Sequence, residues 1–346
     1  MEYRKLGRTG LDISVIGLGT MTWGFQNTQA QGFEQMDYAL EKGVNFFDTA
    51  EMYAIPPTAK TFGTTETIIG NWFASRSNRE KVILASKITG PGLAWIREGK
   101  NYIDKKNILL AVEGSLKRLK TDYIDLYQLH WPNRGSYHFG QIWGFAANFD
   151  AQAEEENFLE VLHTLQELIQ AGKIRHIGLS NETAWGMGKW LQLAQENNLP
   201  RMASIQNEYS LLCRHFEPDL AEIAIHEECG LLAWSPLCRG MLSGKYLNGA
   251  RPQGARITIE TRVEHRVLPQ TDAAIQKYVD LAKQYQLDVC QMALAFVRDR
   301  AFVSSVLIGA TNMEQLKSNI ASISLKLPAE VDEEIGKIRR EFPMLY

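Results

Sequence analysis

The feature that most constrains the fold is a series of short apolar segments separated by longer stretches with helical periodicity. Segments such as Val82-Ile83-Leu84-Ala85 are apolar throughout, which is typical of strands that a parallel sheet buries on both faces. There are eight of them, and they end near Gly17-Leu18-Gly19, Asp48, Lys87, His130, Ser180, Gln206, Ser235 and Gly309. Eight strand-then-helix units without a break predict one (β/α)8 TIM barrel, a single domain over residues 1–346.

Additions to this barrel are expected at both of its ends. Residues 3–5 and 11–13 flank a Gly7-Arg8-Thr9-Gly10 turn and predict an N-terminal β-hairpin that closes the bottom. Long loops follow three predicted strands, and loops after strands form the catalytic face of such a barrel. These loops cover about 88–105, 132–156 and 237–270. An open doubly wound sheet is the alternative, but its G-x-G-x-x-G fingerprint does not occur.

Charge and cysteine usage exclude several classes of function. The chain has 37 Lys and Arg against 40 Asp and Glu, so its net charge of −3 gives no support for bulk binding to nucleic acid or anionic membrane. The cysteines form no C-x-x-C pair, which argues against a zinc site. No signal peptide and no apolar stretch of about 20 residues is recognisable, so we expect a soluble cytoplasmic protein.

Ionisable side chains close three consecutive apolar segments. Asp48, Lys87 and His130 stand at these ends, and Tyr53 follows Asp48 by five residues. A barrel brings strand ends to one mouth, where a Lys87 ammonium held by Asp48 would lower the pKa of Tyr53. Tyr53 would then act as a general acid, with His130 donating a hydrogen bond to the substrate oxygen. The alternatives are a purely structural Asp48–Lys87 ion pair and a rim histidine.

The motifs around these residues resemble those of the aldo-keto reductases over nearly the whole chain. The resemblance rests on Asn45-Phe46-Phe47-Asp48-Thr49-Ala50-Glu51-Met52-Tyr53, on Thr65-Glu66-Thr67-Ile68-Ile69-Gly70, on Ser86-Lys87 and on Asp122 to Pro132. It implies a catalytic tetrad of Asp48, Tyr53, Lys87 and His130, with Tyr53 as the acid. The stretches Thr20 to Gly24 and Glu51 to Pro57 are most similar to the Tas-like bacterial branch of this family.

The same resemblance implies an NADPH cofactor that lies extended across the mouth of the barrel. Ser180, Asn181 and Gln206 match residues that hold the nicotinamide carboxamide. Trp234 stands where the family stacks an aromatic ring on the nicotinamide, with a core aromatic as the alternative.

Residues 235–245 match the family's pyrophosphate loop, in which glycines let backbone N–H groups approach phosphate. The positions implied are Ser235, Leu237, Gly240, Leu242, Gly244 and Lys245. Arg251 and Arg256 lie further along, and either can hold the 2′-phosphate, with Arg256 preferred; the alternative for each is a solvated loop arginine. Gly309, Thr311, Gln315 and Asn319 match the adenosine site. We expect Thr311 to cap the following helix, and we expect the side chains of Gln315 and Asn319 to reach the adenine.

An aromatic wall is expected on the substrate side of the mouth. Trp23 and Trp131 adjoin strand ends and are the preferred substrate-binding residues. Met21, Trp95, Phe139 and Trp143 are further candidates, the last three in long loops. Such a wall suits a flat or apolar carbonyl compound.

The function predicted from the sequence is NADPH-dependent reduction of an aldehyde or ketone by a protein that we expect to be a monomer. Binding of nucleic acid or membrane is not expected. One alternative is an NADPH-binding regulatory subunit resembling potassium-channel β-subunits, with incidental turnover. Another is a metal-dependent barrel hydrolase, which would need a cluster of His and Asp that the strand ends lack.

Overall fold

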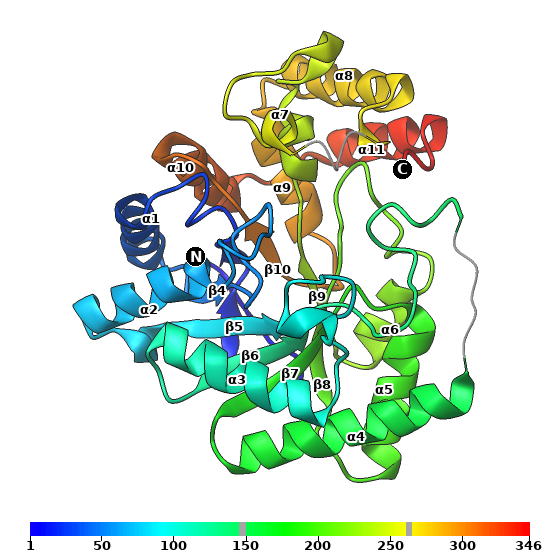
Figure 1. Ribbon diagram of the computed structural model, residues 1–346. Helices are drawn as coiled ribbons and strands as arrows, with labels where there is room; N and C mark the ends of the chain where they lie inside the picture. Colours follow the sequence, from blue (N-terminus) through cyan, green and yellow to red (C-terminus); the bar gives the residue numbers. More distant parts are fainter. Residues whose placement is uncertain (145–149, 261–264) are drawn as a thin grey trace.

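A closed barrel of parallel strands forms the centre of the protein, as the apolar segments predict. The computed structural model describes residues 1–144, 150–260 and 265–346, and within them the strand order is β10-β3-β4-β5-β6-β7-β8-β9 (Figure 1). The strands are β3 (Ile16–Gly19), β4 (Phe46–Asp48), β5 (Ile83–Ile88), β6 (Ile124–Leu129), β7 (Ile174–Ser180), β8 (Met202–Gln206), β9 (Leu231–Ala233) and β10 (Val303–Ile308). The predicted (β/α)8 TIM barrel is confirmed.

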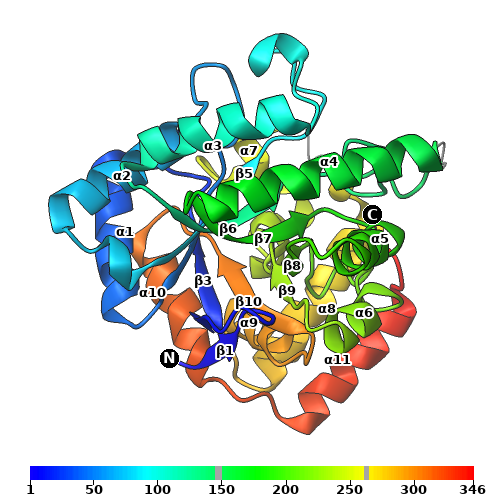
Figure 2. The ribbon, with the colours of Figure 1, turned by 90° about the horizontal axis from the view of Figure 1, so that it is seen from below.

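Helices connect the strands and cover the outside of the barrel (Figures 1 and 2). They are α1 (Gln29–Glu41), α2 (Thr64–Arg76), α3 (Lys105–Leu119), α4 (Ala151–Gln170), α5 (Ala184–Glu196), α6 (Leu220–His226), α7 (Arg256–Ile259), α8 (Pro269–Gln284), α9 (Val289–Arg298), α10 (Met313–Ala321) and α11 (Ala329–Glu341). Polar caps fix several starts, because a side-chain oxygen satisfies a free backbone N–H group. Asp150 caps α4 in this way, so α4 begins before residue 156, where the loop was expected to end.

The N-terminal hairpin closes the bottom of the barrel, as predicted. Strands β1 (Tyr3–Lys5) and β2 (Asp12–Ser14) pair antiparallel, and the view from below shows them near β3 and β10 (Figure 2). Leu6 and Ile13 enter an apolar cluster inside the barrel with Phe46, Ala85, Leu126, Ala203, Leu232 and Leu307. Gly7 is required at the turn, since its φ is +52° and a Cβ there would lie 2.4 Å from the Ala203 carbonyl oxygen.

Three long connections stand at the carboxyl ends of strands. They join β5 to α3, β6 to α4 and β9 to α8, and the last contains the short helices η3 (Cys238–Ser243), η4 (Leu247–Gly249) and α7. Residues 145–149 and 261–264, within two of these connections, lie outside the described residues. In the described parts of the chain, no helix has the length and apolar character needed to span a bilayer.

Candidate active site

A cavity of about 170 Å³ opens at the carboxyl ends of the barrel strands. We call it the mouth cavity. Its walls come from every strand end except that of β5, whose Lys87 lies beneath Tyr53. It is lined by Gly19, Thr20, Met21, Asp48, Met52, Tyr53, Ile55, His130, Trp131, Phe139, Ser180, Asn181, Gln206, Trp234, Ser235, Arg239, Arg256, Leu307, Ile308 and Gly309.

Asp48 and Lys87 form a buried ion pair at the floor of this cavity. The Lys87 ammonium donates to Asp48 Oδ2 over 2.6 Å and to the Thr49 carbonyl oxygen over 2.7 Å. Burial alone would lower the pKa of Lys87, but the charges of Asp48 and Tyr53 outweigh it and the net pKa is raised. Lys87 therefore remains a fixed cation although its side chain is fully buried.

Tyr53 and His130 lie side by side above that pair. Their ring centroids are 5.7 Å apart, and Lys87 Nζ lies 5.1 Å from the Tyr53 ring centroid. Burial raises the pKa of Tyr53 more than the Lys87 charge lowers it, so the net direction is opposite to the expected one. Burial and Lys87 lower the pKa of His130 well below its usual value. At neutral pH both rings are therefore uncharged, and Tyr53 carries a proton that it can donate.

Two glutamines hold the Asp48 carboxylate from the other side. Gln128 Nε2 and Gln206 Nε2 donate to Asp48 Oδ1 over 3.1 and 2.8 Å, and Gln206 Nε2 also donates to Gln128 Oε1. Both amide hydrogens of Gln206 are used in this way, while its side chain still lines the mouth cavity. The Gln206 Oε1 atom thus remains as an acceptor for a ligand amide.

The residues expected around a nicotinamide ring come together on the β7–β9 side. Asn181 Nδ2 donates to the His130 carbonyl oxygen over 2.9 Å, and Asn181 Oδ1 accepts from Trp234 Nε1 over 3.2 Å. Ser180 Oγ donates to the Gln206 carbonyl oxygen over 2.8 Å. Asn181 has a left-handed φ of +52°, which asparagine tolerates better than most residues. The indole of Trp234 is held in place and lines the cavity.

The loop after β9 has an unusual run of left-handed backbone. Ser235, Cys238, Arg239, Gly240 and Gly244 all have positive φ, and Ser235 Oγ accepts from the Arg239 backbone N–H over 3.1 Å. Such turns point successive N–H groups in one direction, which makes an anion-binding concavity. The side chain of Leu242 is buried in the core and that of Leu237 packs against it, so each can offer a ligand only its backbone.

The three basic residues expected near the 2′-phosphate lie in different surroundings. Arg256 lines the mouth cavity and pairs with Glu260 over 2.7 Å. Arg251 is exposed and donates to the Ala250 carbonyl oxygen. Lys245 is exposed as well, yet its Nζ would lie 3.1 Å from a Cβ added at Gly240, so it borders the same turn.

The β10–α10 connection differs in detail from the prediction. Asn312, not Thr311, caps α10, because its side chain accepts from the Gln315 backbone N–H. Gln315 Oε1 accepts from the Thr311 backbone N–H and from its hydroxyl. Asn319 Nδ2 donates to the Gly309 carbonyl oxygen over 3.3 Å, and its side chain is buried. In this structure the two polar side chains therefore brace the turn.

Of the two preferred substrate-binding residues, one lies at the mouth cavity and the other does not. Trp131 lines the mouth cavity, and Phe139 stands beside it with an edge-to-face ring contact. Trp23, in contrast, is fully buried in the core and donates from Nε1 to Gln35 of α1, so its placement on the mouth wall was wrong. The segment after β3 turns back at once, since Trp23 N donates to the Thr20 carbonyl oxygen.

Trp95 and Trp143 also lie away from the mouth cavity. Trp95 packs with Phe62 and the apolar cluster behind Tyr53, whereas the Trp143 side chain is exposed. Met21 lines the cavity, as does Phe139.

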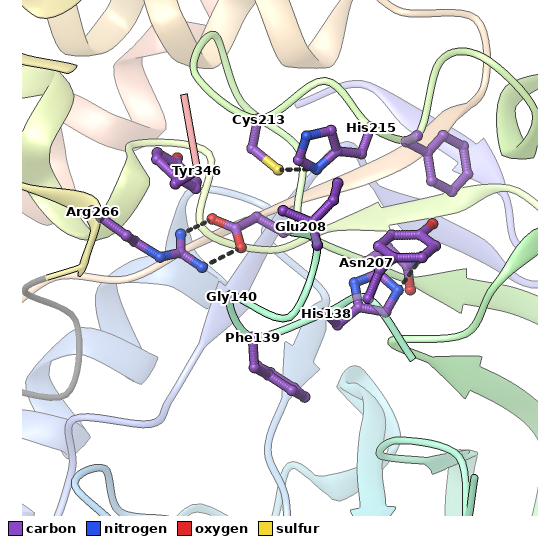
Figure 3. Close-up of a pocket in the computed structure, with 12 residues that line it drawn as sticks. His138, Phe139, Gly140, Asn207, Glu208, Cys213, His215, Arg266 and Tyr346 are labelled. Atoms are coloured by element: carbon purple, nitrogen blue, oxygen red, sulfur yellow. Dashed lines mark hydrogen bonds and ion pairs between the residues drawn. The ribbon is translucent and has the colours of Figure 1, made fainter. Parts of the chain in front are cut away.

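A second, smaller cavity of about 30 Å³ is lined by residues between 137 and 142 of the β6–α4 connection (Figure 3). Glu208 faces the guanidinium of Arg266, and the Tyr346 ring lies 4.4 Å from that guanidinium. The Phe139 ring points away from this pair, and Phe139 lines both cavities. Both side chains are buried, and the opposite charges of Glu208 and Arg266 compensate each other.

The sequence-based prediction missed several residues of the mouth cavity, among them Met52, Ile55 and Arg239, and it also missed Gln128, which binds Asp48 at the cavity floor. Gln128 had a usable signal, since it stands two positions before His130 on a strand and must face the barrel interior as a polar group. Met52 and Ile55 belong to the loop that carries Tyr53. Nothing in the sequence distinguishes Arg239 from a solvated loop arginine. Within residues 1–144, 150–260 and 265–346, no group of three metal-binding side chains comes together.

Several known proteins are similar in sequence to this chain over nearly its full length. It is 48% identical over 345 residues to "Protein tas" of Escherichia coli, covering 99% of both chains, and 35% identical over 340 residues to "Uncharacterized oxidoreductase YrpG" of Bacillus subtilis, covering 96% and 94%. It is 29% identical over 347 residues to "Norsolorinic acid reductase stcV" of Emericella nidulans, covering 96% and 79%. The model of the Aldo/keto reductase family matches residues 15–340. The match to the family model and the identity over nearly the whole length show that the chain belongs to the aldo/keto reductase family.

Proposed function

We propose that this protein reduces an aldehyde or ketone to an alcohol with NADPH, and that Tyr53 supplies the proton. The observation that carries the proposal is the position of the four tetrad side chains at the cavity floor. Tyr53 and His130 face the cavity directly, and the buried Asp48–Lys87 pair lies beneath them.

The residues around the mouth fit a nicotinamide dinucleotide. Trp234 offers a flat aromatic face, Asn181 and Gln206 offer amide groups, and the turn at 235–244 offers backbone N–H groups with Arg239 beside them. A bound reduced nicotinamide would supply the hydride for the carbonyl carbon. The choice of NADPH over NADH rests on the family resemblance and on the basic residues Lys245, Arg251 and Arg256.

Each residue of the tetrad has a separate task. The neutral His130 can donate one ring N–H to the carbonyl oxygen, and its Nδ1 has no partner among the described residues. Tyr53 transfers its proton to that oxygen as negative charge develops there. The Lys87 ammonium near the ring stabilises the phenolate that remains, and Asp48 keeps Lys87 charged and in place.

The decisive experiment is a panel of aldehydes and ketones, followed by the loss of NADPH absorbance, with Tyr53→Phe as the comparison. We expect turnover in the wild type and a loss of about 10²–10⁴-fold in the variant. The NADPH dissociation constant should stay nearly the same, because the phenyl ring is kept. Undiminished turnover in Tyr53→Phe would exclude Tyr53 as the acid, and absence of turnover with every carbonyl would count against the reductase itself.

The cofactor preference has its own test. The dissociation constants of NADPH and NADH are measured for the wild type, Lys245→Gln and Arg256→Gln. We expect the wild type to bind NADPH more tightly than NADH. At least one of the two substitutions should reduce the difference between the two dissociation constants. Equal affinity of the wild type for both cofactors would refute a 2′-phosphate site.

A further inference from the structure

The chain that carries Tyr53 stays paired with β5 beyond the end of β4. Thr49 N donates to the Ala85 carbonyl oxygen over 2.9 Å, and Glu51 N donates to the Lys87 carbonyl oxygen over 3.2 Å. The donors and the acceptors of these bonds are each two residues apart, so the bonds extend the parallel ladder between the two strands. Glu51 is the last residue that donates to β5 in this way before the chain reaches Tyr53.

The next bond of that ladder is made by a side chain instead of the backbone. In a parallel ladder, a residue that donates its N–H to one residue accepts with its carbonyl oxygen from the N–H two positions further along. Here Thr89 N donates to Glu51 Oε1 over 2.8 Å, and the Glu51 carbonyl oxygen accepts from Gly63 N over 2.9 Å. The Glu51 carboxylate therefore replaces a backbone acceptor, and the freed carbonyl lets the chain turn away from the sheet two residues before Tyr53.

An arginine from the β5–α3 connection holds this carboxylate in place. Arg97 Nη1 donates to Glu51 Oε2 over 3.0 Å and Arg97 Nη2 donates to Glu51 Oε1 over 2.9 Å, a two-point contact that fixes the plane of the carboxylate. Ile96, the residue before Arg97, packs with Ala50 and Tyr53 in one apolar cluster. The ion pair thus joins the segment that carries Tyr53 both to β5 and to the connection that follows β5.

The Glu51–Arg97 pair lines a different cavity from the mouth, of about 300 Å³. A substitution of either residue therefore leaves the side chains that line the mouth cavity in the chain. Its effect on a ligand in the mouth is indirect and passes through the position of Tyr53 relative to Lys87, whose Nζ lies 5.1 Å from the Tyr53 ring centroid.

We propose that Glu51 is a positioning residue, which sets the place of Tyr53 above Lys87 by fixing the point at which the chain leaves the sheet. The inference deepens the proposed function and rests on it, because that reaction needs the Tyr53 proton and the Lys87 charge at a fixed separation. A displacement of about 1 Å at reacting groups can cost roughly 10²-fold in rate, even when the substitution lies away from them. Glu51 acts through this geometry and not by contact with a reacting atom.

The test removes the charge of the pair from either side. Glu51→Gln has nearly the same shape, but a single amide oxygen replaces two carboxylate oxygens that accept three N–H groups. Arg97→Gln removes the partner, and Arg97→Lys restores a cation. The matched control is Asp125→Asn, because the buried Asp125 of β6 also accepts from a backbone N–H, that of Leu84, and from an arginine, Arg79.

The chemical step is measured in a single turnover, in which enzyme in excess over NADPH is mixed with a saturating concentration of the best aldehyde of the panel. The amplitude of the NADPH signal reports the active fraction, whereas the rate constant does not depend on how much of the protein is folded. The position of Tyr53 is measured without turnover by ¹⁹F NMR, with 3-fluorotyrosine in place of the 12 tyrosines. The Tyr53 resonance is the one that is missing from Tyr53→Phe.

We expect Glu51→Gln and Arg97→Gln to lower the rate constant roughly 10–100-fold. Asp125→Asn should keep the wild-type rate constant, and Arg97→Lys should recover most of the loss. The dissociation constant of NADPH should stay close to that of the wild type in all four variants. The Tyr53 resonance should move in Glu51→Gln and Arg97→Gln and stay in Asp125→Asn. If Glu51→Gln does not fold, the two variants of Arg97 decide, because Arg97 is the less buried partner.

The proposal is overturned if the folded variants Glu51→Gln and Arg97→Gln keep either the wild-type rate constant or the wild-type Tyr53 resonance, whatever their melting temperatures. An equal fall in the rate constant of Asp125→Asn would overturn it as well, since any buried carboxylate would then have the same effect. Failure of the reductase proposal would look different. The wild type would then oxidise no NADPH with any carbonyl, while the resonance comparison would still show whether Glu51 positions Tyr53.

Discussion

The bottom and the mouth of the barrel are built from the same strands but have opposite chemistry. On β4, Phe46 belongs to the apolar cluster at the bottom, and Asp48 stands two residues further along on the same side. Strand β5 repeats this step with Ala85 and Lys87. The change from apolar to charged thus occurs within one repeat of a strand, which is about 7 Å.

The two regions also contribute to stability in different ways. The cluster around Leu126 gains from the removal of apolar surface from water. The Asp48–Lys87 pair must first be desolvated, so its hydrogen bonds to Thr49, Gln128 and Gln206 offset a cost. The comparison indicates that the bottom is held together by apolar packing, whereas the mouth holds charged groups in fixed positions.

The largest effect is expected from Lys87→Met, which breaks the mouth without touching the bottom. Asp48 would be left as a buried carboxylate without its cation, at a cost of about 3–5 kcal/mol in the free energy of unfolding. Carbonyl reduction should also fall by roughly 10²–10⁴-fold, because the phenolate of Tyr53 loses its stabilising charge. Urea unfolding and steady-state kinetics check both, with the exposed Lys81→Met as control. Normal turnover in Lys87→Met would contradict the assigned role.

Leu126→Ala breaks the bottom instead. The fully buried side chain leaves a cavity, and a loss of about 2–5 kcal/mol in unfolding free energy is expected. Turnover per folded molecule should be unchanged, and Leu110→Ala on the exposed face of α3 should have little effect on either quantity. A marked fall in kcat for Leu126→Ala would show that the two regions are coupled.

Acid should destabilise the mouth side through His138, which lies in the loop above it. Burial lowers the pKa of His138 to about 4, and the unfolded side chain has its ordinary value near 6.5. Unfolding therefore takes up a proton between these values, and the stability from this group falls by up to about 3 kcal/mol as the pH drops from 6.5 to 4. Denaturant unfolding across this range should show a smaller loss in His138→Gln, and an equal loss in both proteins would remove His138 as a cause.

The smallest effect is expected from Gln128→Met. This nearly isosteric change removes one of the donors to Asp48 and should cost about 1–3 kcal/mol. Turnover should fall only several-fold, since Lys87 and Gln206 still hold the carboxylate. Kinetics and unfolding in parallel measure this, and a loss as large as that of Lys87→Met would show that Asp48 depends on Gln128 as much as on Lys87.

The barrel was predictable because each strand can be recognised in the sequence as a separate short apolar segment. The ends at Asp48, Lys87, Ser180 and Gln206 each fall at or within one residue of the end of an observed strand. The convergence of these ends follows from parallel topology, so the gathering of Asp48, Tyr53, Lys87 and His130 followed as well. Their catalytic roles remain proposals.

What the sequence could not supply is the direction of side chains in loops. Trp23 and Trp131 both follow strands, yet one turns into the core and the other toward the cavity. Asn312 and Thr311 are both good caps, and local backbone angles decide between them. Arg239 lines the mouth cavity from a stretch of left-handed backbone, and no pattern of residue types predicts that conformation for an arginine.

Phe139 lies between the mouth cavity and the cavity beside Glu208, and it contacts Trp131 and Trp234. Because Phe139 is exposed and borders the mouth, a substitution there changes the wall of the mouth cavity without removing a buried side chain of the core. Any such change would also alter the packing behind the loop, next to His138 and Asn207. One side chain thus forms part of the wall of both cavities, so a single substitution at Phe139 alters the shape of both at once.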